Sequence, residues 1–566
     1  MGAPGPPRKP LGIKQLTLSF CAGATLATLL HGLHAPGYSP PSDAACQTSG
    51  VPPPVLHGCS SQQQSGGPSV VPPLLPPLPW EPLLTAAQLR RGLSFYGSGA
   101  RIERVAAKLL AGQPITAVTL GASVTRGHGA SSVESGYPSR FFDFLNASFP
   151  HRDHVLLNKG IGATNSGIYA VCFEKLVPAG ADLVVVEFTF NEHSAVPFPH
   201  PTRRGFEQLL RKLLRLPASP AVIVLHHYAW FYAYGDGVEA GLYYRPAEAQ
   251  LSTLAQYYDI PAPSVRNALY RMMQADVAPY KARPPLQHLR LVLLVSRVLV
   301  PNLVTVHNRT VPSAEAGTEG DYFYKDIIHP ADSGHQAMAE LLAGVVQTAL
   351  LNVAAAGGEA GETDEAPEEL PPPMIPRNLD HPTSVCAMQE DFQPVAKGME
   401  GFEYKAERPK APTFVEQKWG YRGSGTGAWV ELEISTQQER AVEGAQKADA
   451  PTRHATVHLG YLRSYVHMAL ARAECTSGCT CEPTYLDGLW AQRSSLTQIH
   501  SFEASPAAVT QHPRCRIRVT IVPRTADTPG GLRPPGAGGK FQLSAIMVAH
   551  IPITVPVGAR ETMNLR

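Results

Sequence analysis

The chain of 566 residues has no excess of charge of either sign. Its 48 Lys and Arg face 46 Asp and Glu, so the net charge is +2, and only 17% of the residues are charged. Nucleic-acid-binding domains usually carry a strongly basic face, so this balance argues against a DNA or RNA partner. The sequence also has no GxxxxGK phosphate loop, and no GxGxxG opens a helix, so nucleotide binding is not indicated.

Long hydrophobic runs are missing as well. The uncharged run at residues 16–30 follows Arg8, Lys9 and Lys14, and its length fits a long signal-peptide core or a short membrane anchor. No clear small-x-small cleavage site follows, which favours an uncleaved signal anchor at residues 1–34 over a signal peptide. Either would send the rest of the chain into the secretory pathway. The apolar segment at residues 290–300 is too short to span a bilayer and predicts a buried helix.

Proline, glycine and charge divide the chain into parts. Residues 35–87 are rich in proline and predict an extended stem. Residues 355–379 are acidic and proline-rich, which is typical of a linker. Between them, residues 88–354 alternate predicted strands with predicted helices, which indicates an α/β domain with a parallel sheet. After the linker, short alternating strands at residues 380–555 predict an all-β domain of the sandwich or jelly-roll kind.

Four of the nine cysteines lie close together in the predicted β domain. They are Cys475, Cys479, Cys481 and Cys515. In an oxidising compartment they would form two disulfides, with three possible pairings. A zinc site is the alternative, but the spacing CxxxCxC lacks the usual CxxC pair, so we favour disulfides.

The strand predicted at residues 115–120 runs directly into the sequence GASVTRG at residues 121–127. A serine after a strand and a glycine is typical of a nucleophile on a turn, so Ser123 is a candidate nucleophile. The later sequence DIIHP places Asp326 and His329 three positions apart. Together these residues supply a nucleophile, a base and an orienting carboxylate.

The same residue order occurs in α/β-hydrolases, but those carry GxSxG and take the acid and the base from separate loops. In this chain Thr125 replaces the second glycine, and Asp326 and His329 share one loop. Two further blocks lie between them: NKGIGATNSG at residues 158–167 and FTFNEH at residues 188–193, each after a short apolar run. This series of four blocks resembles the SGNH (GDSL) hydrolase superfamily.

The resemblance implies an SGNH-type three-layer domain with a central parallel sheet. It implies that three donors stabilise the oxyanion: the backbone N–H groups of Ser123 and Gly162 and the side-chain amide of Asn191. The N–H of Ala163 is an alternative to that of Gly162. Three positions depart from the family pattern: Ala122 and Glu192, where Asp is usual, and Thr189, where Gly is usual. None removes a group with direct chemistry, so they indicate a divergent branch.

The resemblance further implies a serine esterase that removes an acyl group, expected to be acetyl, from an O-acylated carbohydrate. Two alternatives stay open: a polysaccharide O-acetyltransferase that uses the same site, and a glycan-binding protein without catalysis. No His, Asp or Glu cluster near the blocks has metal-ligand spacing, so neither a metal nor another cofactor is expected.

The expected cellular location of the protein follows from the predicted anchor. A short anchor, a stem and a lumenal domain are the layout of many Golgi enzymes; secretion is the alternative. Membrane contact is expected only through the N-terminal segment. Asn146 and Asn308 lie in N-x-S/T sequons and are candidate glycosylation sites. Five aromatic residues of the β domain are candidates for a sugar platform, although such residues more often fill a core: Trp419, Tyr421, Trp429, Tyr461 and Trp490.

Overall fold

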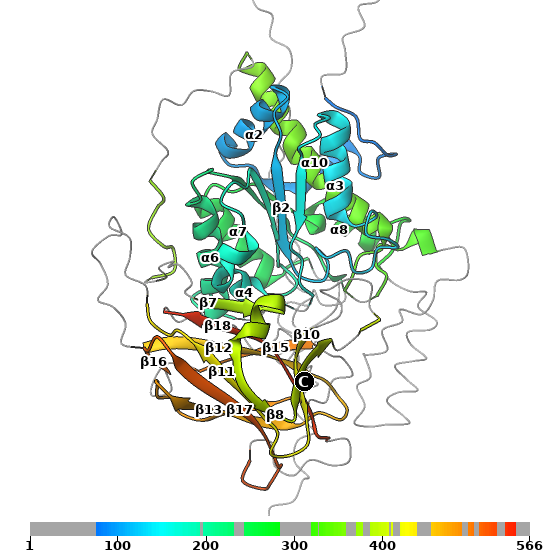
Figure 1. Cartoon of the computed structure of the whole chain (residues 1–566). Coiled ribbons are helices and arrows are strands. Elements are labelled where there is room, and N and C mark those ends of the chain that lie inside the picture. Colours follow the sequence, from blue (N-terminus) through cyan, green and yellow to red (C-terminus); the bar gives the residue numbers. More distant parts are fainter. Residues whose placement is uncertain are drawn as a thin grey trace, which may run out of the picture. The chain divides into compact units, whose positions relative to one another are not determined.

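The structure is a computed structural model of the chain (Figure 1). It describes residues 75–162, 164–192, 196–230, 243–282, 319–326, 328–357, 369–376, 378, 385–406, 409–410, 419–438, 454–489, 496–502, 509–528 and 538–550. The predicted signal anchor, most of the predicted stem and the apolar segment at residues 290–300 lie outside these ranges.

The first described region alternates helices and strands as the sequence predicts. Its elements are α1 (Ala86–Gly92), β1 (Leu93–Phe95), α2 (Ala100–Leu110), β2 (Thr116–Gly121), α3 (Tyr137–Ser148), β3 (Val155–Asn158), α4 (Ser166–Val171), α5 (Phe173–Leu176), β4 (Leu183–Glu187), α6 (Pro201–Leu214), β5 (Ala221–Val224), α7 (Pro246–Tyr257), β6 (Ala262–Pro263), α8 (Val265–Gln274), the 3-10 turn η3 (Glu319–Asp321) and α10 (Asp332–Ala355).

Four of these strands form a parallel sheet in the order β3-β2-β4-β5. Every residue of β4 and β5 is buried, which is expected where helices cover both faces of a parallel sheet. Alternate side chains point to opposite faces. Val185 and Ile223 join the core beneath α2, α3, α8 and α10, whereas Val184 and Val222 join the core beneath α4, α6 and α7. The predicted three-layer α/β architecture is therefore confirmed.

Helix α10 is the long central helix on the first face of the sheet. It packs against α2 and α3. Among the residues that the structure describes, it alone is long and apolar enough to cross a membrane, but most of its apolar stretch is buried inside the protein. This burial is typical of a core helix.

The second described region contains strands and one 3-10 helix. Its elements are β7 (Val385–Met388), η4 (Gln389–Val395), β8 (Ala396–Glu400), β9 (Phe402–Ala406), β10 (Trp419–Ser424), β11 (Trp429–Ile434), β12 (His454–Arg463), β13 (Leu470–Ser477), β14 (Thr484–Asp487), β15 (Leu496–Ser501), β16 (Val509–Thr510), β17 (Cys515–Val522) and β18 (Lys540–Ala549).

These strands form two antiparallel sheets that enclose one core. The larger sheet has the order β15-β12-β18-β10-β9, with β16 beside β12 and β7 beside β18. The smaller has the order β14-β13-β17-β11-β8. In β17 every second residue is buried, so one face of this strand packs inward and the other faces outward. The predicted β-sandwich is confirmed.

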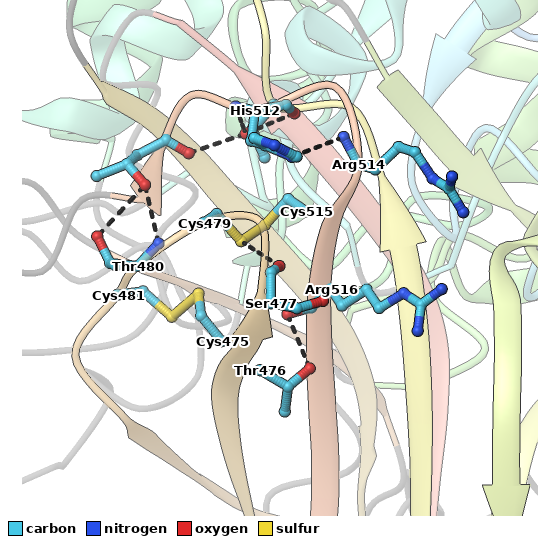
Figure 2. Close-up of a disulfide and its surroundings, with 12 residues drawn as sticks. Cys475, Thr476, Ser477, Cys479, Thr480, Cys481, His512, Arg514, Cys515 and Arg516 are labelled. Carbon is cyan, nitrogen blue, oxygen red and sulfur yellow. Dashed lines mark hydrogen bonds between the residues drawn. A yellow bond between two sulfur atoms is a disulfide. The ribbon is translucent and has the colours of Figure 1, made fainter.

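The four clustered cysteines form two disulfides, Cys475–Cys481 and Cys479–Cys515 (Figure 2). The first closes a short loop at the end of β13, and the second connects this loop to the first residue of β17. Because the sulfur atoms are bonded to one another, they are not available as thiolate ligands, and the zinc alternative is not supported.

A third disulfide, Cys172–Cys386, was not predicted. It joins the residue after α4 to β7, over a sequence separation of 214 residues. Lys175 adds a hydrogen bond of 3.0 Å to the carbonyl oxygen of Met388. Three disulfides are typical of a protein in an extracellular or secretory environment.

Two segments outside the regular elements are bound to helices of the α/β region. Glu340 on α10 accepts backbone hydrogen bonds from Leu83 and Leu84, and a third from Trp80 Nε1. Glu207 on α6 accepts hydrogen bonds from the backbone of Met374 and the side chain of Asn378. Parts of the predicted stem and linker therefore pack against the α/β region.

Candidate active site

Ser123 lies on a tight turn just after β2. The turn is closed by hydrogen bonds from Arg126 N–H to Ala122 O (3.0 Å) and from His128 N–H to Ser123 O (2.9 Å). Gly121 is required at its start, because a Cβ there would lie 1.8 Å from Thr125 Oγ1. The strand, the glycine and the turn together present the Ser123 hydroxyl at the carboxyl edge of the sheet, where catalytic groups of open α/β folds collect.

The structure brings the three predicted residues Ser123, His329 and Asp326 into one hydrogen-bonded chain. Ser123 Oγ lies 2.8 Å from His329 Nε2, and His329 Nδ1 lies 2.7 Å from Asp326 Oδ2. His329 is 8% exposed. In this geometry the imidazole can accept the serine proton while the carboxylate holds the opposite ring nitrogen.

Asp326 is held as a carboxylate. Burial opposes its ionisation, but hydrogen bonds from the side chain and backbone of His329 and from the backbone of Ile328 outweigh burial and lower its pKa to about 2. Both of these backbone bonds measure 2.8 Å and reach Asp326 Oδ1. The other oxygen, Oδ2, is free to accept the hydrogen bond from His329 Nδ1. The Asp326 carboxylate is therefore charged and oriented at neutral pH.

Two further histidines fix the surroundings of the site without carrying charge. Burial lowers the pKa of His227 to about 3 and that of His335 to about 4, so both rings are neutral at pH 7. His227 Nε2 lies 2.9 Å from the carbonyl oxygen of Ile328, next to His329. His335 Nδ1 accepts the backbone N–H of Tyr137 at 3.2 Å, which connects α10 to α3. No motif in the sequence singles out either of these histidines.

Gly162 and Asn191, the predicted oxyanion donors, lie on loops that follow β3 and β4. Strands β3 and β4 flank β2, so both loops lie beside the Ser123 turn. A Cβ at Gly162 would lie 3.9 Å from Ser123 Cβ, which places this loop against the serine. Asn191 is 8% exposed, and its Oδ1 has no hydrogen-bond partner among the described residues. Ala163, the alternative donor, lies outside the described residues.

A buried polar group behind the Ser123 turn was not predicted. Glu187, the last residue of β4, is fully buried, and its Oε2 accepts a hydrogen bond from Thr125 Oγ1 at 3.2 Å. Tyr137 OH lies 2.8 Å from the same Thr125 oxygen. Burial raises the pKa of Glu187 to about 8, although the Thr125 hydrogen bond opposes this rise. The carboxyl is therefore mostly protonated at neutral pH, which only its tertiary burial reveals.

Three groups near the site have ligand atoms close enough for a metal ion. Atoms of His128, Asp326 and His329 lie within 4.8 Å of one another, a proximity that sequence spacing did not predict. The His128 ring meets the His329 ring edge-on, with centroids 4.2 Å apart. Both nitrogens of His329 already have hydrogen-bond partners. The absence of a catalytic metal stays a prediction.

The remaining predicted residues are distributed as follows. Asn146 is exposed near the end of α3, as a glycosylation site requires, and Asn308 lies outside the described residues. Tyr421 and Tyr461 belong to the core of the sandwich. Trp429 carries the Arg518 guanidinium 4.3 Å from its ring centroid, Trp419 stacks on Tyr404, and Trp490 is not described.

Comparison with known proteins finds similarity in structure alone. No protein-family model matches the sequence, and no curated protein matches it. The structure is similar to that of a two-domain esterase active on acetylated mannans, with a TM-score of 0.52 and 16% sequence identity, over 82% of this chain and 99% of that chain. A second structure of that esterase, co-crystallised with mannopentaose, has a TM-score of 0.51 and 16% identity over 81% and 97% of the two chains. The shared feature is the two-domain fold.

Proposed function

We propose that this protein is a serine esterase of the SGNH type that removes acetyl groups from an O-acetylated carbohydrate. The observation that carries the proposal is the hydrogen-bonded chain from Ser123 through His329 to Asp326, with distances of 2.8 and 2.7 Å. The three side chains come from loops about two hundred residues apart in sequence. Such a convergence at the carboxyl edge of a parallel sheet is a specific signature of nucleophilic catalysis.

The first step is attack on the ester. Ser123 Oγ forms a bond to the acyl carbon while His329 Nε2 takes the hydroxyl proton. The charged Asp326 stabilises the imidazolium that results. When the intermediate collapses, the bond between the acyl carbon and the sugar oxygen breaks, and His329 returns the proton to that oxygen. The products are the free sugar hydroxyl and an acetyl group on Ser123.

The second step is hydrolysis of the acyl-enzyme. His329 takes a proton from water, the oxygen of this water attacks the acyl carbon, and Ser123 leaves with the proton as acetate is released. In both steps the carbonyl oxygen gains negative charge. We assign its stabilisation to the backbone N–H groups of Ser123 and Gly162 and to the side-chain amide of Asn191.

The carbohydrate part of the proposal is supported by the fold comparison. The similar protein acts on acetylated mannans and has the same two-domain architecture over nearly its whole length. The three disulfides support action in the secretory pathway or outside the cell, where O-acetylated polysaccharides are met. Within this proposal, residues 1–34 anchor the protein in a Golgi-type membrane and Asn146 carries a glycan.

The test is release of acetate from p-nitrophenyl acetate and from acetylated mannan by the full chain. Ser123→Ala is expected to abolish both reactions, and Asn191→Ala to lower kcat on the order of 10²-fold, since it removes one oxyanion donor. Ser132→Ala is the matched control, because this serine is exposed on the segment between β2 and α3 and forms only surface hydrogen bonds.

Folded wild-type protein with no more activity than Ser123→Ala on either substrate would overturn the proposal. Addition of a deacetylated polysaccharide as an acceptor distinguishes hydrolysis from acetyl transfer. An esterase releases acetate to water whether or not this acceptor is present, whereas a transferase would pass the acetyl group to the acceptor.

A further inference from the structure

Glu192 directly follows the predicted oxyanion donor Asn191 and is buried. Its side chain is 1% exposed. One of its oxygens, Oε1, accepts two hydrogen bonds from Ser166, one from the backbone N–H (3.1 Å) and one from the hydroxyl (2.5 Å). Ser166 is the first residue of α4, directly after the loop that contains Gly162. A single carboxylate thus joins the loops that carry two of the three predicted donors.

Helix α4 carries the connection further, to the nucleophile turn. Tyr169 OH lies 2.6 Å from the carbonyl oxygen of Gly121 and 2.7 Å from that of Lys159, and it accepts the N–H of Ile161 at 3.0 Å. Gly121 is two residues before Ser123, and Ile161 immediately precedes Gly162. Tyr169 on α4 therefore helps to hold the Gly162 loop against the Ser123 turn, beside the direct hydrogen bond from Ile161 N–H to Gly121 O (3.0 Å).

We propose that Glu192 is a positioning residue for the oxyanion hole: it holds α4, and through α4 the Gly162 loop, in register with Asn191 and Ser123. This inference rests on the proposed esterase function.

The contacts to Ser166 require a hydrogen-bond acceptor at the end of a side chain of this length. Burial raises the pKa of Glu192, while the guanidinium of Arg203 and the hydrogen bonds from Ser166 act in the opposite direction. The Arg203 contact is 3.6 Å, longer than those to Ser166. A glutamine keeps the side-chain length and a carbonyl acceptor, so Glu192→Gln should preserve most of the function.

Glu248 on α7 is a matched control within the same region. It is 1% exposed, accepts a hydrogen bond from Ser264 Oγ at 2.6 Å and pairs with Arg266 at 3.1 Å. It therefore shares with Glu192 the burial, the serine donor and the arginine neighbour. It contacts neither α4 nor the loops of the proposed oxyanion donors in the contacts described, so its loss should affect stability without affecting the oxyanion hole.

The experiment compares Glu192→Ala, Glu192→Gln, Glu248→Ala and the wild-type full chain on p-nitrophenyl acetate, with Tm measured for each. We expect Glu192→Ala to lower kcat on the order of 10²-fold, comparable to the loss of one oxyanion donor, with little change in KM. Glu192→Gln should restore most of this loss. Glu248→Ala should lose at least as much Tm while retaining kcat within about twofold, since it leaves the donors in place.

A second readout separates positioning from general destabilisation. A trifluoromethyl ketone forms a tetrahedral adduct with the serine, and its oxygen occupies the oxyanion hole. Its inhibition constant should rise in Glu192→Ala by about the same factor as kcat/KM falls, and should not change in Glu248→Ala. Equal effects of the two variants on kcat and on inhibitor binding, or a Glu192→Ala variant with wild-type kcat, would overturn the inference.

Failure of the inference is distinguishable from failure of the proposed function. An inactive wild-type protein would refute the esterase proposal itself. The coupling can then be tested without activity by hydrogen exchange of the amides of residues 159–171. Faster exchange there in Glu192→Ala, but not in Glu248→Ala, would support the coupling; unchanged exchange would overturn it.

Discussion

The α/β region and the β-sandwich both contain paired polar side chains, and two sets of these pairs differ in their exposure to solvent. Glu187 and Glu192 are at most 2% exposed, and each is held by hydrogen bonds near the carboxyl edge of the parallel sheet. In the sandwich, Arg516 forms ion pairs with Glu431 and Glu433 on the outward face of β11 and β17, where its side chain is 37% exposed.

This difference has energetic consequences. A buried polar group loses its hydration and depends on its protein partner, so the partner sets both its orientation and its pKa. An exposed ion pair exchanges its partner for water at little cost. Substitution of the buried groups that hold the site should therefore change activity or pH dependence. Substitutions in the sandwich should change stability alone, and the largest such change is expected from loss of a disulfide.

The largest expected effect is that of His329→Ala. It removes the group that accepts the Ser123 proton at 2.8 Å, and kcat on p-nitrophenyl acetate should fall on the order of 10⁴-fold. Tm should also fall, because the buried Asp326 loses its partner at Oδ2, but the protein should stay folded at the assay temperature. Steady-state kinetics beside thermal unfolding checks both statements. Activity within tenfold of wild type would remove His329 from the proposed mechanism.

The double variant Cys479→Ser/Cys515→Ser in the sandwich should lose stability and keep its activity. This disulfide spans 36 residues, so its loss should lower the free energy of unfolding by about 4 kcal/mol. The kcat at 25 °C should stay at the wild-type value, because the disulfide lies within the sandwich. Urea unfolding and the p-nitrophenyl acetate assay check this. A proportional loss of kcat below the unfolding transition would break the contrast between the two regions.

Glu187→Gln tests the buried carboxyl through pH. The pKa of Glu187 in the folded protein is about 8, above the ordinary value of 4.5, so its contribution to stability is complete below about pH 4.5 and declines as the pH rises to about 8. Glutamine imitates the protonated form and does not titrate. The stability of the variant relative to wild type should therefore increase by about 3–4 kcal/mol from pH 5 to pH 8. Urea unfolding at both pH values measures this change. The same difference in the free energy of unfolding between variant and wild type at pH 5 and at pH 8 would contradict the raised pKa.

The smallest effect is expected for Arg516→Ala on the outer face of the sandwich. Its partners Glu431 and Glu433 each keep a second arginine, Arg518 and Arg514, so Tm should fall by no more than about 2 °C, and less at high salt. The control is the same measurement on the disulfide variant. A fall in Tm as large as that of the disulfide variant would show that the ion pairs of Arg516 stabilise the sandwich as much as the disulfide does.

Much of the architecture is predictable from the sequence because it depends on local patterns. The apolar runs that became β2, β4 and β5, the acid and base on one loop, and the alternating residues of β17 all carry their signal within a few residues. Each of these patterns also indicates which face of an element is buried or at which end its polar site residues lie. The order of the four blocks was therefore enough to predict that Ser123, Asp326 and His329 would meet.

The missed features depend on contacts between distant segments. The disulfide partners Cys172 and Cys386 are 214 residues apart in sequence, and no spacing rule pairs them. The raised pKa of Glu187 depends on burial that only the packed sheet produces. Glu192 was noticed as a departure from the family pattern, but its connection to Ser166 required the two loops to be placed in space.

The most direct test of the account is covalent labelling of the full chain with a fluorophosphonate, followed by mass spectrometry of the peptides. The reagent reports an activated serine without any assumption about the natural substrate. The account predicts a single adduct on Ser123, absent in Ser123→Ala and formed much more slowly in His329→Ala. Labelling of a different residue, no labelling of the folded protein, or equal rates in wild type and His329→Ala would contradict it.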